Sequence, residues 1–165
     1  MVVVVMGVSG AGKTTVGSLL ARALGWEFFD ADDFHPTANV AKMARGEPLD
    51  ESDRGGWLER LAGLVDRLLR ERRSAVLACS ALRASHRIRL TDGHRAAEVR
   101  IVYLRTDPRL LRARLEARQG HFMKAALLAS QLATLEEPHD ALVVDSDAPP
   151  ATLVERIRAH LERPG

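Results

Sequence analysis

The chain has 165 residues, a length that suits one domain with a sizeable core. Hydrophobic residues make up 46% and charged residues 28%, and the net charge of +2 provides no basic excess for binding nucleic acid. The single cysteine, Cys79, excludes a disulfide framework or a zinc cluster and favours a reducing, cytoplasmic compartment. Only six apolar residues precede Gly7, too few for a membrane span, so we expect one domain over residues 1–165 without membrane association.

The first predicted strand, residues 2–6, leads into a phosphate-binding loop. Residues 7–14 read GVSGAGKT, a full match to the pattern GxxxxGK[ST], and Val16, Leu20 and Leu24 then recur at helical spacing. Glycines let backbone N–H groups curl around phosphate oxygens, whereas a glycine-rich turn that binds nothing would not need the lysine and threonine. We therefore predict a nucleoside triphosphate site made by Gly7, Ser9, Gly10, Ala11, Gly12, Lys13, Thr14 and Thr15, with Lys13 on the β- and γ-phosphates and Thr14 on Mg²⁺.

Further strand-like runs occur at residues 27–30, 75–79, 99–104 and 141–145, and helical patterns lie between them. One apolar stripe covers residues 58–69, a shorter pattern follows Pro108, and the last covers residues 153–161. This alternation predicts an α/β fold in which a parallel sheet lies between two layers of helices. Ligands of such sheets bind beyond the carboxyl ends of the strands, so the loops after residues 6, 30, 79 and 104 are the candidate site.

Two carboxylates, Asp30 and Asp32, end the second predicted strand. One could hold Mg²⁺ through water while the other orients or deprotonates an acceptor hydroxyl. An acidic turn that caps a helix is the alternative interpretation. Strand alternation predicts that Asp33 points elsewhere. Ser80 ends the third strand beside the phosphate loop, Cys79 is expected to be a small buried hydrophobe, and residues 142–145 are expected at the edge of the base pocket.

Two stretches, residues 31–57 and 114–138, are too long to be simple connections. Phosphoryl transfer requires that water be excluded, so one insertion could close over the acceptor and the other over ATP. His35 and Arg54 lie in the first insertion, and Arg83 and Arg87 follow the third predicted strand. These four residues could grip an anionic acceptor, although each arginine alone could be a surface residue. The second insertion contains Arg114, Arg118 and His121, typical of a lid, with a solvated helix end as the alternative.

Taken together, these features resemble the gluconate kinase family over nearly the whole chain. The resemblance is carried by MGVSGAGKT at 6–14, DAD at 30–32, HP at 35–36, KM at 42–43, GEPL at 46–49, DR at 53–54 before Trp57, CSAL at 79–82, GHF at 120–122 after Arg118, and LEEP at 135–138. It implies a five-stranded P-loop kinase fold of the nucleoside and shikimate kinase type, ATP-dependent phosphorylation of D-gluconate at its 6-hydroxyl, Mg²⁺ as cofactor, and a homodimer.

The resemblance also implies roles for individual residues. Lys13 and Arg118 would act on the transferring phosphoryl group, Asp30 would assist Mg²⁺, and Arg114 would cover the nucleotide. The acceptor would be held by Asp32, His35, Arg54, Ser80, Arg83, Arg87 and His121, with Asp32 as base or hydroxyl orienter. Arg83 stands where the family usually has lysine. The alternatives are a related kinase acting on shikimate or another sugar acid, a nucleotide-binding regulatory module, and a nucleic-acid kinase.

Overall fold

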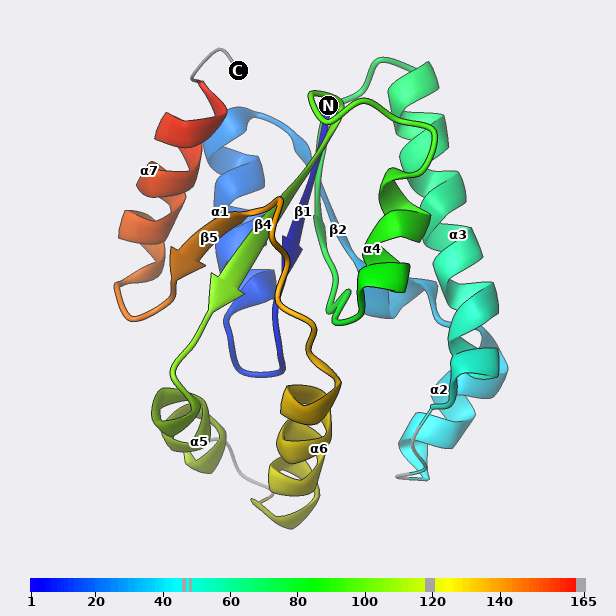
Figure 1. The fold of residues 1–165 in the computed structure, drawn as a ribbon, viewed down its shortest axis with the longest axis vertical. Coiled ribbons are helices and arrows are strands. Elements are labelled where there is room, and N and C mark those ends of the chain that lie inside the picture. The colour runs from blue at the N-terminus through cyan, green and yellow to red at the C-terminus, as the bar shows by residue number, and fades with distance from the viewer. Residues whose placement is uncertain (46, 48, 118–120, 163–165) are drawn as a thin grey trace.

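The computed structural model describes residues 1–45, 47, 49–117 and 121–162 (Figure 1). Its sheet is made of five parallel strands in the order β2-β3-β1-β4-β5. They are β1 (Val2–Met6), β2 (Glu27–Asp30), β3 (Ala75–Ala78), β4 (Val99–Arg105) and β5 (Leu142–Asp145). All five were predicted from the sequence to within one residue at each end, and their parallel arrangement confirms the predicted α/β class.

Four helices coincide with the predicted apolar stripes: α1 (Lys13–Leu24), α3 (Glu51–Arg70), α5 (Pro108–Glu116) and α7 (Pro150–Leu161). The start of α3 is fixed by a capping box, in which Asp50 and Asp53 each accept from the other's backbone N–H. The predicted insertions are largely helical as well. The first contains a 3₁₀ helix, η1 (Ala31–Phe34), and α2 (Thr37–Ala44), and the second contains α6 (His121–Thr134); α4 (Ala84–Thr91) follows β3.

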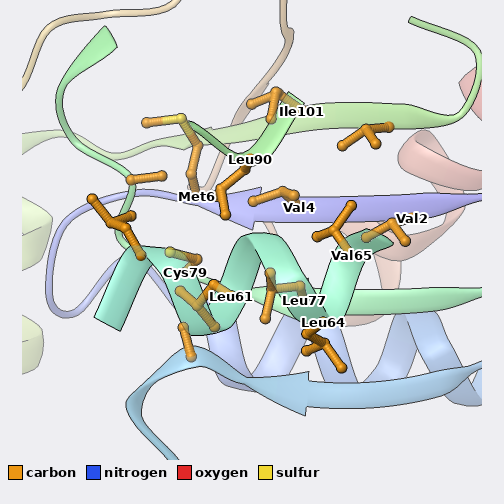
Figure 2. Close-up of a cluster of buried hydrophobic side chains, with 14 of the residues drawn as sticks. Val2, Val4, Met6, Leu61, Leu64, Val65, Leu77, Cys79, Leu90 and Ile101 are labelled. Atoms are coloured by element: carbon orange, nitrogen blue, oxygen red, sulfur yellow. The ribbon is translucent and has the colours of Figure 1, made fainter. Parts of the chain in front are cut away.

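Two hydrophobic cores lie on opposite faces of the sheet, because successive side chains of a strand point to opposite faces. On β1, Val2, Val4 and Met6 face α3 and α4, where they meet Leu61 and Leu90 (Figure 2). The remaining valines of β1 face the other layer, made by α1 and α7, where the buried partners are Val16, Leu20, Leu153 and Ile157. Every residue of β1 is fully buried, as expected of the central strand of a parallel sheet covered on both sides.

The strands all point toward the end of the molecule where the loop after β1 and the helices α5 and α6 lie (Figure 1). The N-terminus lies at the opposite end. The carboxyl ends of β1, β2, β3 and β4 therefore open toward the two insertions, which is the arrangement needed for a site that the insertions cover. Among the helices that the structure describes, none is both long and apolar enough to cross a bilayer.

Candidate active site

The phosphate-binding loop connects β1 with the N-terminus of α1. Gly10 and Gly12 adopt φ angles of 86° and 96°, values that residues with a Cβ rarely adopt, so the conformation of this loop depends on glycine. Gly12 is the N-cap of α1 and has no side chain to cap the first-turn N–H groups. These groups and the positive end of the helix dipole are therefore available to an anion.

Lys13, the first residue of α1, extends along this loop, and its Nζ donates to the Val8 carbonyl at 3.2 Å. Burial lowers the pKa of Lys13, while the negative charges of Asp32 and Asp30 oppose that shift. The two carboxylates therefore lie close enough to Lys13 to act on its charge. This juxtaposition joins the phosphate-binding loop to the end of β2, as the sequence predicted.

Thr14 and Asp30 form the direct link between these two loops. The Thr14 hydroxyl donates to Asp30 Oδ2 at 2.8 Å, and Asp30 Oδ1 accepts from the Asp32 backbone N–H at 3.1 Å. A hydroxyl and a carboxylate oxygen are hard donors of the kind that Mg²⁺ prefers, and Mg²⁺ usually takes only one or two protein ligands beside phosphate and water. The donor set therefore fits the predicted metal.

Asp32 lies in the 3₁₀ helix η1 rather than on an extension of β2. We expected strand alternation to point Asp33 in another direction from Asp32. That argument does not apply, because β2 ends at Asp30 and the residues that follow form η1. The Asp32 side chain is 88% exposed. Such exposure leaves its carboxylate free to meet a ligand that enters from solvent.

His35 follows η1 and is held by aromatic stacking. Its ring lies on the indole of Trp57, with centroids 4.7 Å apart and planes 11° apart, and its Nε2 is 3.9 Å from Asp32 Oδ1. Trp57 is itself buried and donates from Nε1 to the Ala31 carbonyl at 2.7 Å. Burial lowers the pKa of His35, so the ring is kept neutral near neutral pH. Trp57 thus fixes both η1 and the histidine.

Arg54 and Arg83 converge on Glu51, a residue that the sequence analysis did not single out. Glu51 Oε1 is 3.1 Å from Arg54 Nη1 and 3.5 Å from Arg83 Nε, and Glu51 Oε2 is 3.3 Å from His86 Nε2. The hydrogen-bonding contact with His86 contributes most to holding the pKa of Glu51 below its usual value, and Arg83 and Arg54 act in the same direction. In the described part of the chain, Arg83 Nε is buried without a hydrogen-bond partner. The Arg83 and Arg54 side chains are 43% and 32% exposed, so their guanidinium groups can meet a further anionic group that enters from solvent.

The turn after β3 contains the half-buried Ser80. Hydrogen bonds from Arg87 hold this turn in place. Ala81 has a strained φ of 43°, and Arg87 Nη1 donates to the carbonyls of Ala81 and Leu82, each at 3.1 Å. Arg87 is buried and its Nη1 positions this turn, while its predicted contact with the acceptor stays a prediction. Cys79 is buried as predicted, and burial raises its pKa to about 12, so it remains a neutral thiol.

Among the described side chains of the second insertion, those of Arg114 and Gln131 contact the phosphate-binding loop. Arg114 Nη1 donates to the Gly10 carbonyl at 3.2 Å, and its Nη2 donates to the Ser146 carbonyl at 2.7 Å. Gln131, on α6, accepts from the Ser9 backbone N–H at 2.6 Å. Arg118 and the His121 side chain lie outside the described residues. The expected position of this insertion over the loop therefore rests on Arg114 and Gln131.

Three contributors were missed by the sequence analysis: Glu51, Gln131 and Asn39, which contacts His35. None belongs to a motif with a recognised spacing. Glu51 is 32 residues from its partner Arg83, and Gln131 is 122 residues from its partner Ser9. Only the fold brings these two distant pairs together, so no local pattern could have indicated them, whereas Asn39 lies only four residues from His35.

The fold and the linked P-loop and acidic pair define a P-loop kinase of small molecules. A family model described as "AAA domain" matches residues 2–138. The gluconokinase of Gluconobacter oxydans (strain 621H) is 43% identical over 162 residues, covering 96% of this chain and 90% of that protein. The chain belongs to the gluconokinase family.

Two solved structures are also similar. An unliganded sugar kinase from Janibacter sp. HTCC2649 is 43% identical with a TM-score of 0.86, covering 98% of this chain and 94% of that one. A gluconokinase from Sinorhizobium meliloti 1021 is 39% identical with a TM-score of 0.82, covering 96% and 90%. The likeness therefore extends over the whole fold and includes both insertions.

Proposed function

We propose that this protein transfers the γ-phosphoryl group of ATP to the 6-hydroxyl of D-gluconate, giving 6-phospho-D-gluconate and ADP. The observation that carries the proposal is the hydrogen bond of Thr14 with Asp30, because it joins the phosphate-binding loop to the loop that bears Asp32. Donor and acceptor chemistry can then meet at one edge of the sheet. Membership of the gluconokinase family favours gluconate over shikimate as the acceptor.

On the nucleotide side, backbone N–H groups of the loop and the Lys13 ammonium would hold the phosphates. Lys13 is well suited to this because it lies in the loop with its charge balanced by Asp30 and Asp32. Thr14 and, through water, Asp30 would hold Mg²⁺. Bound there, the ion would neutralise charge on the β- and γ-phosphates. Arg114 would cover the nucleotide, Arg118 would act on the transferring phosphoryl group, and His121 would help to hold the acceptor.

On the acceptor side, the exposed carboxylate of Asp32 would orient the attacking hydroxyl and accept its proton. His35, fixed on Trp57, would contact the same part of the acceptor. Arg54 and Arg83 would grip the gluconate carboxylate, because guanidinium groups match carboxylates in two parallel hydrogen bonds. Among the described residues, Arg83 Nε makes no hydrogen bond beside its 3.5 Å ion pair with Glu51, which supports this assignment. Ser80 would line the pocket from the turn that Arg87 supports.

The proposal is tested by measuring ADP release with ATP and Mg²⁺ across gluconate, shikimate, glycerate and nucleoside monophosphates. We expect stimulation by gluconate alone, whereas stimulation by shikimate alone would overturn the assignment. Asp32→Asn should lower kcat far more than it weakens gluconate binding, and Asp33→Asn on the same 3₁₀ helix is the matched control. Size measurement in solution would test the homodimer, and fractionation of cells the cytoplasmic location, which are both part of the proposal.

A further inference from the structure

Asn39 is a buried polar residue with no role in the reaction as described so far. It lies on α2, is 3% exposed, and contacts both the start of α3 and the His35 ring. Burying an amide side chain is costly unless its hydrogen bonds are satisfied. Its partners therefore indicate what the amide does.

The orientation of the Asn39 amide follows from its contact with a backbone carbonyl. Asn39 Nδ2 is 2.8 Å from the Asp53 carbonyl oxygen, which can only accept, so the NH₂ group must be at this end. The same nitrogen lies 3.4 Å from His35 Nδ1. An NH₂ group can only donate, so a hydrogen bond between the two nitrogens needs Asn39 as its donor. His35 Nδ1 must therefore be the acceptor.

We propose that Asn39 is a positioning residue that keeps the proton of the neutral His35 ring on Nε2, the nitrogen that faces Asp32. The catalytic consequence rests on the proposed function, whereas the proton position itself does not. A proton on Nδ1 would place two donors against each other at 3.4 Å. The Asn39 contact thus selects one of the two neutral tautomers.

The surroundings of the ring also favour the neutral form over the cation. Trp57 covers one face of the ring, and burial lowers the pKa of His35, with a smaller contribution from the positive charge of Arg54 on α3. The carboxylate of Asp32, on η1, acts in the opposite direction. Asp53 offers its carbonyl to Asn39, and its carboxylate is paired with Lys42 of α2. Cation formation would require a proton on Nδ1, where Asn39 already donates.

This tautomer divides the work between His35 and Asp32. An Nε2–H group can donate to an oxygen of the acceptor, but it cannot accept a proton from a hydroxyl. The Nε2 to Asp32 distance of 3.9 Å exceeds a hydrogen bond, so the proton is available to a ligand oxygen. Asp32 is then the group left to accept the hydroxyl proton, and His35 orients the acceptor.

The test is a long-range ¹H–¹⁵N NMR spectrum of the full chain at neutral pH, which distinguishes the protonated ring nitrogen from the bare one. The His35 signals are identified by their loss in His35→Gln. We expect Nε2 protonated and Nδ1 bare, and a protonated Nδ1 would overturn the proposal. In Asn39→Asp, whose carboxylate accepts, the proton should move to Nδ1, and in Asn39→Ala the two tautomers should mix.

An unchanged pattern in a folded Asn39→Ala protein would also overturn the proposal, and this variant serves if Asn39→Asp does not fold. Kinetics add a second readout, because the Gln amide nitrogen mimics Nε2 and the Asn amide nitrogen mimics Nδ1. His35→Gln should therefore keep several-fold more kcat with gluconate than His35→Asn. Equal losses would count against the assignment. If the wild type does not phosphorylate gluconate, the proposed function fails while the NMR result still decides the tautomer.

Discussion

The Thr14 hydroxyl donates to the Asp30 carboxylate at 2.8 Å across the end of an intervening strand, because β3 lies between β1 and β2 in the sheet. The contact therefore joins the loops that follow β1 and β2, two strands that are not neighbours in the sheet. In the proposed function, Thr14 and, through water, Asp30 would hold Mg²⁺ at this junction. The carboxyl ends of β1 and β2 thereby form one site.

The first prediction concerns the metal side of this pair. Thr14→Val should lower turnover about 10- to 100-fold and raise the Mg²⁺ concentration needed for half-maximal activity, since one metal ligand and its hydrogen bond to Asp30 are lost. Steady-state ADP release over a Mg²⁺ titration measures both effects. Ser18→Ala, one turn along α1, removes a hydroxyl that bonds to the Thr15 carbonyl and should change neither quantity. A normal Mg²⁺ requirement in Thr14→Val would remove Thr14 from the metal site.

The second prediction concerns the indole N–H of Trp57. Trp57→Phe keeps the ring under His35 but removes the 2.7 Å bond to the Ala31 carbonyl, which then lies buried without its donor. We expect a loss of about 1–3 kcal/mol in the free energy of unfolding, measured by urea denaturation. Trp26→Phe, at a partly buried position against the other core, is the control for the change in ring size. Equal losses in both variants would show that packing, not the hydrogen bond, matters at position 57.

The sheet was predictable because β1 and β3 are short apolar runs and each of the other strands contains at least two consecutive apolar residues. Val2–Met6 is buried on both faces and therefore has no polar alternation to confuse the assignment. The GVSGAGKT loop was predictable because its chemistry fixes its spacing. Asp30 was placed correctly because parallel strands end at the same edge, and position in the chain alone then puts its carboxylate near Thr14.

Several contacts within the site were not predictable, because they join side chains that are distant in the sequence. Glu51 gathers Arg54 from its own helix and Arg83 from the turn before α4, and no spacing rule connects positions 51 and 83. Arg87 shows the converse. The sequence around Arg87 is polar and suggests an exposed side chain. Its guanidinium is buried because the strained turn at Ala81 leaves carbonyls that need hydrogen-bond donors.

The third prediction is a pH dependence of stability. Burial lowers the pKa of folded His35 below its ordinary value of 6.5, so below that pH the unfolded chain binds the proton more readily than the folded one. Stability should therefore fall as the pH drops through about 6.5 toward the folded-state pKa. Urea denaturation of wild type and His35→Gln near pH 7.5 and near pH 5.5 measures this. The wild type should lose more stability than the variant between the two values, and His160→Gln, exposed on α7, should behave as wild type.

A parallel loss in wild type and His35→Gln would mean that His35 does not resist protonation. Such a result would leave the stacking on Trp57 intact, because that contact does not depend on charge. It would instead indicate that solvent reaches the ring in the folded state and stabilises the cation.

The last prediction concerns the grip on the acceptor. Arg54→Ala should weaken gluconate binding about 10- to 100-fold, the range expected when a hydrogen bond between charged groups worth about 1.5–3 kcal/mol is lost. Calorimetric titration with gluconate measures the Kd directly, without turnover. Arg60→Ala, at an exposed position on the same helix, is the matched control and should leave the Kd unchanged. If Arg54→Ala also binds gluconate normally, the acceptor's carboxylate is not held at the Glu51 cluster, and Arg54 serves only as the partner of Glu51.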